Sequence, residues 1–321
     1  MRKIGLLCFV WLLALWVGAA PPKDLSVSAL AWSEDGAMLA VGSNNGDVTL
    51  YSGEGPRLKL LPRQVGAIRG LYWRGQELIS VSSDGTIRSS ARLDPLVNAG
   101  YLSKVERGGS RLALFGYNGL QIFDLDQDRI IARAKMPLDQ SAEFAIDPQG
   151  GYLSVKEPEA CVLVDASSGQ VVQRIAVQRG VVGQAFGQTG TLLVNAGKVV
   201  EYTVPKGELV RDYAGDNPRL FRLSPDGRSL LVCLANSASI YPDREDSPKS
   251  VNLPLAATEF AGDNSVLQVG AQSRVVTYSG EKVITFELPR KYCQVYAINP
   301  RRTLLAVGLS DGSMRLLPLY K

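Results

Sequence analysis

The sequence predicts an all-β protein, built as one closed ring of repeated four-stranded units. Three observations lead to this fold class: short apolar runs between Gly, Pro, Asn and Asp turns, a turn that recurs at a nearly constant spacing, and a near absence of helical patterns along the 321 residues. Short alternating segments with turn residues at regular intervals are typical of all-β domains.

The stretch SSDGTIRSS, residues 82–90, shows one hairpin of such a unit. Asp84 and Gly85 predict a two-residue turn of type I′, because both residue types tolerate positive φ and this turn matches the twist of paired strands. An apolar run precedes the turn and an alternating strand follows it. The same arrangement recurs in VGSNNGDVTLY from Val41, FGYNGLQIFDL from Phe115 and VGLSDGSMRLL from Val307.

A second turn precedes these hairpins and reveals the period of the repeat. It separates two apolar segments, as in FRLSPDGRSLLV, and it occurs eight times at spacings of 34 to 41 residues. Each unit then contains four short strands, which in the first unit are SALAW, MLAVGS, DVTLYS and RLKLLP. The eight turns are placed at Gly36, Gly75, Gly109, Gly150, Gly190, Gly227, Asn264 and Arg302.

A four-stranded unit cannot bury its faces alone, so the units must stack on one another. A closed ring of four-stranded antiparallel units is a β-propeller. The eight turns predict a single propeller domain of eight blades over residues 20–321, with seven blades as the alternative. The last unit ends on its third strand, and Pro22–Ser26 is the candidate for the fourth strand that would close the ring.

The turn motifs resemble those of WD40 repeats. Residues 82–88, SSDGTIR, and residues 310–315, SDGSMR, are similar to the hairpin between the second and third strands of that repeat. Residues 224–227, SPDG, are similar to the turn between its first and second strands. The SPDG turn is shared with TolB-type propellers, whereas the SDG hairpins favour the WD40 type. The resemblance implies a propeller that offers one face of the ring to partners.

The chain departs from the WD40 pattern at the residues that tie each blade together in that family. The Gly-His and Trp-Asp pairs are absent, and Phe123-Asp124 and Val164-Asp165 are the nearest counterparts of the second pair. Because those pairs form buried hydrogen bonds in the family, we expect apolar packing between blades to take over their role here.

Residues 1–19 predict a secretory signal peptide. Arg2 and Lys3 precede an apolar run that is shorter than the roughly 20 residues of a membrane span, and Val17-Gly18-Ala19 fits a small-residue cleavage site. The mature chain, residues 20–321, is then expected in the periplasm or outside the cell, without stable insertion in a membrane. An uncleaved membrane anchor is the alternative.

Composition excludes several classes of function. The chain has 35 Lys and Arg against 31 Asp and Glu, a net charge of +4 that falls to +2 when Arg2 and Lys3 leave with the signal. This balance argues against a general nucleic-acid binder. The chain contains no histidine, which excludes Ser-His-Asp and Cys-His catalysis and the usual zinc sites. We expect no enzymatic activity, no metal and no cofactor.

Two groups of chemically active residues are expected to be structural. Cys161, Cys233 and Cys293 fall in units that are not neighbours in the ring, so we expect buried thiols without an intramolecular disulfide. Residues 124–128, DLDQD, carry alternating carboxylates that could bind calcium, but they lack the glycine and the distal glutamate of an EF-hand loop. A solvated turn is therefore the expected role of these residues.

The connections from each fourth strand to the next first strand open on one face of the ring. They carry a modest excess of basic residues, which could receive an acidic or extended protein partner. We expect a monomeric, non-catalytic, protein-binding scaffold; the alternative is a propeller that binds a small ligand or a glycan in its central channel. The candidate partner-binding residues are Arg63, Gln64, Arg179, Arg219, Arg290 and Lys291.

Overall fold

The structure is a computed structural model of the chain. It describes residues 25–136, 138, 142–177, 180–187, 190–213, 217–224, 227–234, 237–244, 248–251, 257–262, 265–269, 273–277, 283–286 and 293–319. The predicted signal peptide, residues 1–19, lies outside the described residues.

The described strands form eight antiparallel sheets, and consecutive strands are neighbours in each of them. The first four sheets have four strands each. They are β1 (Val27–Trp32), β2 (Met38–Ser43), β3 (Val48–Ser52) and β4 (Arg57–Leu60); β5 (Ile68–Arg74), β6 (Glu77–Ser82), β7 (Thr86–Ser89) and β8 (Val97–Asn98); β9 (Leu102–Gly108), β10 (Arg111–Gly116), β11 (Gly119–Asp124) and β12 (Arg129–Arg133); and β13 (Phe144–Ile146), β14 (Tyr152–Lys156), β15 (Ala160–Asp165) and β16 (Val171–Ala176).

The next three sheets also have four strands, and the eighth has three among the described residues. A 3-10 turn, η1 (Pro242–Arg244), follows β23 and is the one helical element in the described part of the chain. The strands are β17 (Gly183–Gly187), β18 (Thr191–Asn195), β19 (Val199–Thr203) and β20 (Leu209–Tyr213); β21 (Leu220–Leu223), β22 (Leu230–Cys233), β23 (Ala238–Tyr241) and β24 (Lys249–Val251); β25 (Ala257–Gly262), β26 (Ser265–Val269), β27 (Ser273–Thr277) and β28 (Val283–Phe286); and β29 (Cys293–Ile298), β30 (Leu304–Leu309) and β31 (Met314–Pro318).

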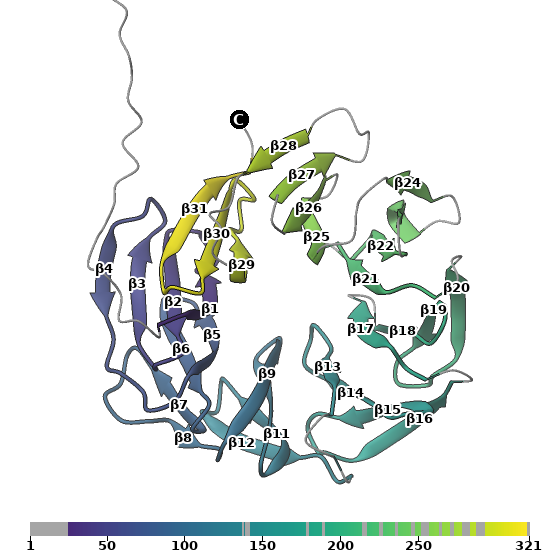
Figure 1. Ribbon diagram of the computed structural model, residues 1–321. Helices are drawn as coiled ribbons and strands as arrows, with labels where there is room; N and C mark the ends of the chain where they lie inside the picture. The colour runs from purple at the N-terminus through teal and green to yellow at the C-terminus, as the bar shows by residue number, and fades with distance from the viewer. Residues whose placement is uncertain are drawn as a thin grey trace, which may run out of the picture.

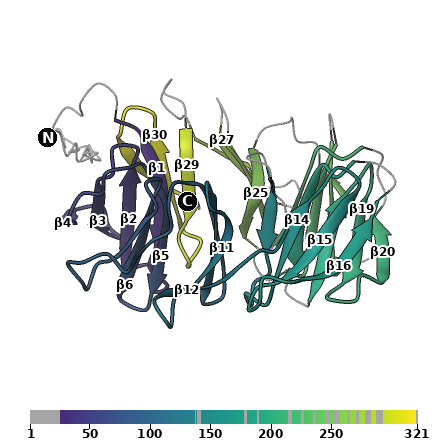
Figure 2. The ribbon, with the colours of Figure 1, turned by 90° about the horizontal axis from the view of Figure 1, so that it is seen from below.

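The sheets follow one another around a common axis, with each first strand nearest the axis and each fourth strand at the outside (Figure 1). The strands run between the two ends of this arrangement, so the turns gather on two faces (Figure 2). We call the face that holds the turns between second and third strands, and the connections between sheets, the connection face. The prediction of an all-β fold made of four-stranded antiparallel units is confirmed. No described sheet closes on itself.

The second strands are largely buried in the first two sheets, whereas the outer strand of the first sheet is exposed. β2 and β6 are buried over their last five residues, whereas all four residues of β4 are exposed. The same register position holds a leucine without exposed surface in five successive second strands, because neighbouring sheets cover both faces of these strands. These leucines are Leu39, Leu78, Leu112, Leu153 and Leu192.

The turns between first and second strands lie where the repeat predicts them. Six of the predicted positions are glycines with φ between 55° and 77°, and Arg302 also has a positive φ of 55°. Asn264 lies outside the described residues. The left-handed backbone at these turns explains why glycine recurs there.

The hairpin at Asp84-Gly85 differs from the predicted type I′ turn. Its loop has three residues, 83–85, and positive φ occurs at Gly85 alone, with a hydrogen bond from Gly85 N to Ser82 O of 3.0 Å. This is the geometry of a type I turn followed by a left-handed residue. A Cβ at Gly85 would lie 2.1 Å from the carbonyl oxygen of Gly100, so the next connection leaves no room for a side chain.

Hydrogen bonds from side chains to the backbone link the first strands of neighbouring sheets. This finding corrects the expectation of purely apolar packing between blades. Trp32 Nε1 donates to Ala297 O and Trp73 Nε1 donates to Ala31 O, both at 3.1 Å. Arg107 occupies the same register position in the third sheet, and its Nη1 donates to Trp73 O at 2.8 Å. Each donor thus stabilises the seam with the preceding sheet.

The first and eighth sheets pack against each other. The hydrogen bond from Trp32 to Ala297 O crosses the seam between these sheets. Val27, Leu39 and Ala306 belong to one buried cluster at this seam. Of the predicted closing strand Pro22–Ser26, Leu25 and Ser26 are described and belong to no strand, while residues 22–24 lie outside the description. The eighth sheet therefore has three strands in the described part of the chain.

We expect Trp73→Phe to lower the free energy of unfolding by about 1 to 3 kcal/mol, because it removes one buried hydrogen bond and leaves a small cavity. The side chain of Trp73 is 3% exposed and the Phe ring cannot donate to Ala31 O. Urea unfolding measures the change. Tyr117→Phe, at a side chain that is 84% exposed, is the matched control and should leave the stability unchanged. Equal stability of the two variants would contradict a structural role for the hydrogen bond from Trp73 to Ala31 O.

Candidate functional site

The connection face is formed by segments that hydrogen-bond to one another through their backbones. The connection after β4 bonds to the first hairpin turn, with Gln64 N donating to Gly46 O at 3.0 Å. The connection after β8 bonds to the hairpins on both sides: Leu102 N donates to Ser83 O at 2.9 Å, and Tyr117 N donates to Tyr101 O at 3.0 Å. The first three sheets therefore present a preformed surface rather than independent loops.

Large apolar side chains project from this surface. Val65 is 91% exposed, Tyr101 58% and Tyr117 84%. Tyr101 and Tyr117 are neighbours, because the connection after β8 and the β10–β11 turn share the backbone bond just described. Val182, in the connection after β16, is 54% exposed on the same face. Exposed aromatic residues on a rigid base are a common feature of protein-binding surfaces.

The two residues predicted side by side, Arg63 and Gln64, have opposite environments. The Arg63 side chain is 64% exposed, donates from Nε to Asn45 O at 2.9 Å, and lies 3.7 Å from Asp47 Oδ1. Gln64 is 3% exposed, and its Nε2 donates to Ser80 Oγ at 2.5 Å. The Gln64 side chain therefore belongs to the seam between the first two sheets, and it does not face a partner on the surface.

Arg219, also a predicted residue, is exposed in the connection between the fifth and sixth sheets. It lines a cavity of about 570 Å³ together with Val182, Asn195 and Asn217. Its backbone N donates to Cys233 O at 2.9 Å, which holds this connection against β22. The cavity opens on the connection face, between loops rather than in the centre of the ring.

The structure does not bring the predicted residues together. Arg63 follows β4 and Arg219 precedes β21, and these strands lie on opposite sides of the common axis of the sheets (Figure 1). Arg179, Arg290 and Lys291 lie outside the described residues, so their role stays a prediction. Val65, Tyr101 and Tyr117 are not among the residues predicted to bind a partner. A signal for Tyr117 is present, since a large aromatic residue directly precedes the Asn118-Gly119 turn.

The acidic run 124–128 forms the turn between β11 and β12 on the face opposite the connection face. Asp124 Oδ1 accepts the backbone N–H groups of Asp126 and Gln127 at 2.9 Å each. Asp128 forms ion pairs with Arg74 and Arg92 at 2.8 and 3.1 Å. These contacts support the interpretation as a structural turn. No group of three or more His, Cys, Asp or Glu side chains within the described residues is placed to hold a metal ion.

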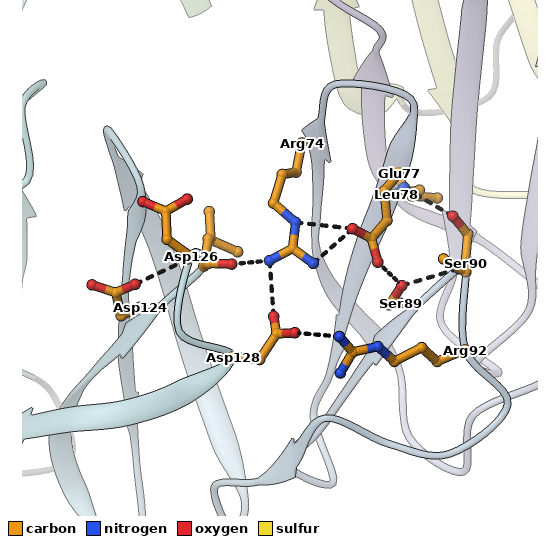
Figure 3. A network of polar contacts seen from close by, with 11 residues as sticks. Arg74, Glu77, Leu78, Ser89, Ser90, Arg92, Asp124, Asp126 and Asp128 are labelled. Atoms are coloured by element: carbon orange, nitrogen blue, oxygen red, sulfur yellow. Dashed lines mark hydrogen bonds and ion pairs between the residues drawn. The ribbon is translucent and has the colours of Figure 1, made fainter.

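Arg74, at the end of β5, is the hub of this network and links the second and third sheets (Figure 3). Its Nε and Nη2 lie 2.9 and 2.6 Å from Glu77 Oε2, and its Nη1 donates to Leu125 O as well as to Asp128. Burial of Glu77 would raise its pKa, but hydrogen bonds from Ser89 and Arg74 and the nearby positive charge outweigh it, so the Glu77 pKa lies below its ordinary value.

Cys161 and Cys233 are free and buried, as predicted for these two thiols. Desolvation raises the pKa of Cys161 to about 12 and that of Cys233 to about 11. Both groups therefore stay protonated near neutral pH, which makes them poor nucleophiles. The side chain of Cys293 lies outside the described part of the chain. None of the described helical segments has the length and apolar character needed to cross a membrane.

Comparisons with known proteins agree with this geometry. A family model described as the anaphase-promoting complex subunit 4 WD40 domain matches residues 10–76. The crystal structure of the computationally designed Ika8 protein is 12% identical, with a TM-score of 0.72 over 93% of this chain and 97% of that chain. The β-propeller domain of Cps50 (Swd1) from Myceliophteria thermophila is 15% identical, with a TM-score of 0.58 over 92% of this chain and 98% of that one.

A comparison with curated protein sequences found no match. The family model and the two structures confirm the resemblance to WD40-like repeat β-propellers. At these sequence identities the structural likeness shows the fold, and it carries no information about partners.

We expect Glu77→Gln to change how stability depends on pH. The folded-state pKa of Glu77 lies below the ordinary value of 4.5, so its ionised form contributes stability that is present above that value and is lost as pH falls through the folded-state pKa. Below pH 4.5 the free energy of unfolding should therefore fall less steeply in the variant than in the wild type. Urea unfolding at a series of pH values measures both slopes. Glu54→Gln, in the β3–β4 turn, is the control, and parallel curves for wild type and Glu77→Gln would contradict the assignment.

Proposed function

We propose that this chain is a non-catalytic protein-binding scaffold that binds its partner through the connection face. The observation that carries the proposal is the exposure of Val65, Tyr101 and Tyr117 on a surface whose segments are fixed by backbone hydrogen bonds. A preformed apolar surface requires little ordering when a partner binds, so more of the contact energy remains as affinity.

The charged residues of this face define the polar part of the proposed interface. Arg63 and Arg219 are exposed on it and carry positive charge toward solvent. Cations at the rim of an interface act mainly on the rate of association and on the choice of partner. An acidic or extended protein segment therefore fits this face better than a basic one. Arg179, Arg290 and Lys291 complete the proposed basic rim on sequence grounds.

The alternative function is the binding of a small ligand or a glycan. The cavity of about 570 Å³ beside Arg219 favours this alternative, since ligand pockets commonly have volumes of about 300 to 1,000 Å³. The central channel, named in the sequence analysis, is the other candidate for such a ligand. Both locations differ from the Tyr101–Tyr117 patch, so variants can separate the two functions.

The proposal includes export as a monomer to the periplasm or the extracellular space, after cleavage behind Ala19. The support is the sequence pattern of residues 1–19: two basic residues, a short apolar run and a small-residue cleavage site. The lack of histidine and the structural use of the acidic 124–128 turn support a non-catalytic role.

We further propose a closed ring of eight blades. The contacts between the first and eighth sheets support closure of the ring. The position of Leu25 beside Gly312 supports the segment before β1 as the source of the fourth strand of the eighth sheet. A Cβ at Gly312, in the β30–β31 turn, would lie 2.8 Å from Leu25 Cδ2, so the residue just before the first sheet lies beside the eighth sheet. We propose that the predicted closing segment Pro22–Ser26, through its part before Leu25, supplies a fourth strand beside β31, with prolines at an edge position.

We expect Val65→Glu/Tyr117→Glu to reduce capture of the native partner by about tenfold or more, because charges replace two exposed apolar contacts. The measurement is affinity purification of the mature chain from its native envelope fraction with quantitative mass spectrometry. Val171→Glu/Val172→Glu is the matched control, since these side chains are 40% and 43% exposed on β16, away from the connection face. Equal recovery of the partner by both variants, or no enriched protein with the wild type, would contradict the proposal.

We expect a mature chain that starts at Leu25 to melt several degrees below one that starts at Ala20, because the eighth sheet loses its fourth strand. A chain with residues 20–24 replaced by Gly and Ser at equal length should show most of the same loss. Scanning calorimetry measures all three proteins. Identical melting temperatures would mean that residues 20–24 do not complete the eighth sheet.

A further inference from the structure

A groove runs along the outer strand of the third sheet, separate from the connection face. It has a volume of about 490 Å³ and is lined by residues 130–135 and by Ser168 of the fourth sheet. β12 pairs with β11 on one side, and no described strand pairs with its other side. The backbone of β12 therefore offers an edge to which an extended segment can add.

One wall of the groove is a preformed turn of the neighbouring sheet. Lys135 N donates to Gly169 O at 2.8 Å, and a Cβ at Gly169 would lie 1.9 Å from Arg133 O, so this close approach requires glycine. Asp165 Oδ1 holds the turn by accepting the backbone N–H groups of Ser167 and Ser168 at 2.9 and 2.8 Å. Little conformational freedom is lost at this wall when a segment binds.

The groove is positively charged. Arg129, Arg133 and Lys135 are exposed along it. The Arg129 guanidinium donates to Gln127 Oε1, whereas no ion pair within the described part of the chain includes Arg133 or Lys135.

Two acidic side chains of the adjoining turns are held by other groups. Asp128 is bound by Arg74 and Arg92, and the Asp165 carboxylate accepts hydrogen bonds from its own turn. An incoming segment therefore meets two exposed cations beside the apolar surface of Ile130 and Ile131.

We propose that this groove binds an extended acidic segment of a partner protein, which adds to β12 as a further strand of the third sheet. Main-chain hydrogen bonds to the edge of β12 before Arg133 provide affinity, because the turn at Gly169 covers the edge from Arg133 O to Lys135 N. Acidic side chains near the exposed Arg133 and Lys135 provide selectivity. A second copy of this chain is a poor occupant, because pairing of two β12 strands would place like charges opposite each other. The proposal does not depend on the connection face.

The test uses a fluorescent peptide of alternating Glu and Val residues, titrated with the mature full-length chain and followed by fluorescence anisotropy. Arg133→Glu/Lys135→Glu should weaken binding of this peptide about tenfold, because two attractive charges beside the bound segment become repulsive. Arg57→Glu/Lys59→Glu makes the same change of charge on the exposed outer strand β4 and should alter binding by less than about twofold. Ser168→Glu, which changes the wall alone, replaces the double variant if that protein does not fold.

A peptide with N-methyl groups on alternate amides separates strand addition from simple charge attraction. It keeps the charge but loses backbone donors, so it should bind more weakly than the parent peptide. Equal binding of the two peptides, or an equal loss in the β4 control variant, would overturn the proposal. Failure of the parent peptide to bind the wild type would also overturn it. Binding to phosphatidylglycerol vesicles in place of the peptide would instead identify a membrane surface as the occupant.

Discussion

The seam between neighbouring sheets is the contact on which this structure depends. A single four-stranded sheet exposes two apolar faces, and only stacking against the next sheet removes both from water. The leucines of the second strands, such as Leu39 and Leu78, have no exposed surface because of this stacking. Indole groups of Trp32 and Trp73 then fix one sheet to the previous one with a hydrogen bond from the first strand. The apolar area supplies most of the stability, and the directed bonds set the relative position of the sheets.

Ionic contacts reinforce the same seams near the face opposite the connection face. Arg74 and Asp128 join the second and third sheets, and Arg244 and Glu201 join the sixth and fifth. The Glu201 side chain is 5% exposed, and Tyr213 donates to its Oε2 at 2.7 Å. Burial and this carboxylate raise the pKa of Tyr213 above its ordinary range. Removal of one partner would leave a buried charge alone, so such a pair holds two sheets together even where its net contribution is small.

The contacts between neighbouring segments give the connection face a preformed surface, which supports the binding role proposed for it. Its loops approach the neighbouring turns so closely that a Cβ at Gly46 or Gly116 would lie 2.0 or 1.8 Å from a backbone oxygen of the next segment. Side chains at the remaining positions, including Tyr101 and Tyr117, then project from a base that backbone hydrogen bonds hold together. The outer strands have no following strand to cover them, and this leaves the cations of β12 beside an open edge. Two surfaces of different chemistry thus result from one repeated unit.

Local patterns in the sequence determined the strands, the turns between first and second strands and their period, because φ preferences and two-residue alternation act within a few neighbouring residues. The three-residue loop at Asp84-Gly85 was missed; its Gly85 lies so close to Gly100 of the next connection that a Cβ there would clash. Burial of Gln64 beside exposed Arg63 was also missed, because Ser80 of the following sheet receives the Gln64 amide. Exposure of Tyr117 and the open edge of β12 depend likewise on what the neighbouring sheets cover. Tertiary structure alone decided these features. The residue type at one position does not show which distant segment will cover its side chain and exclude water from it.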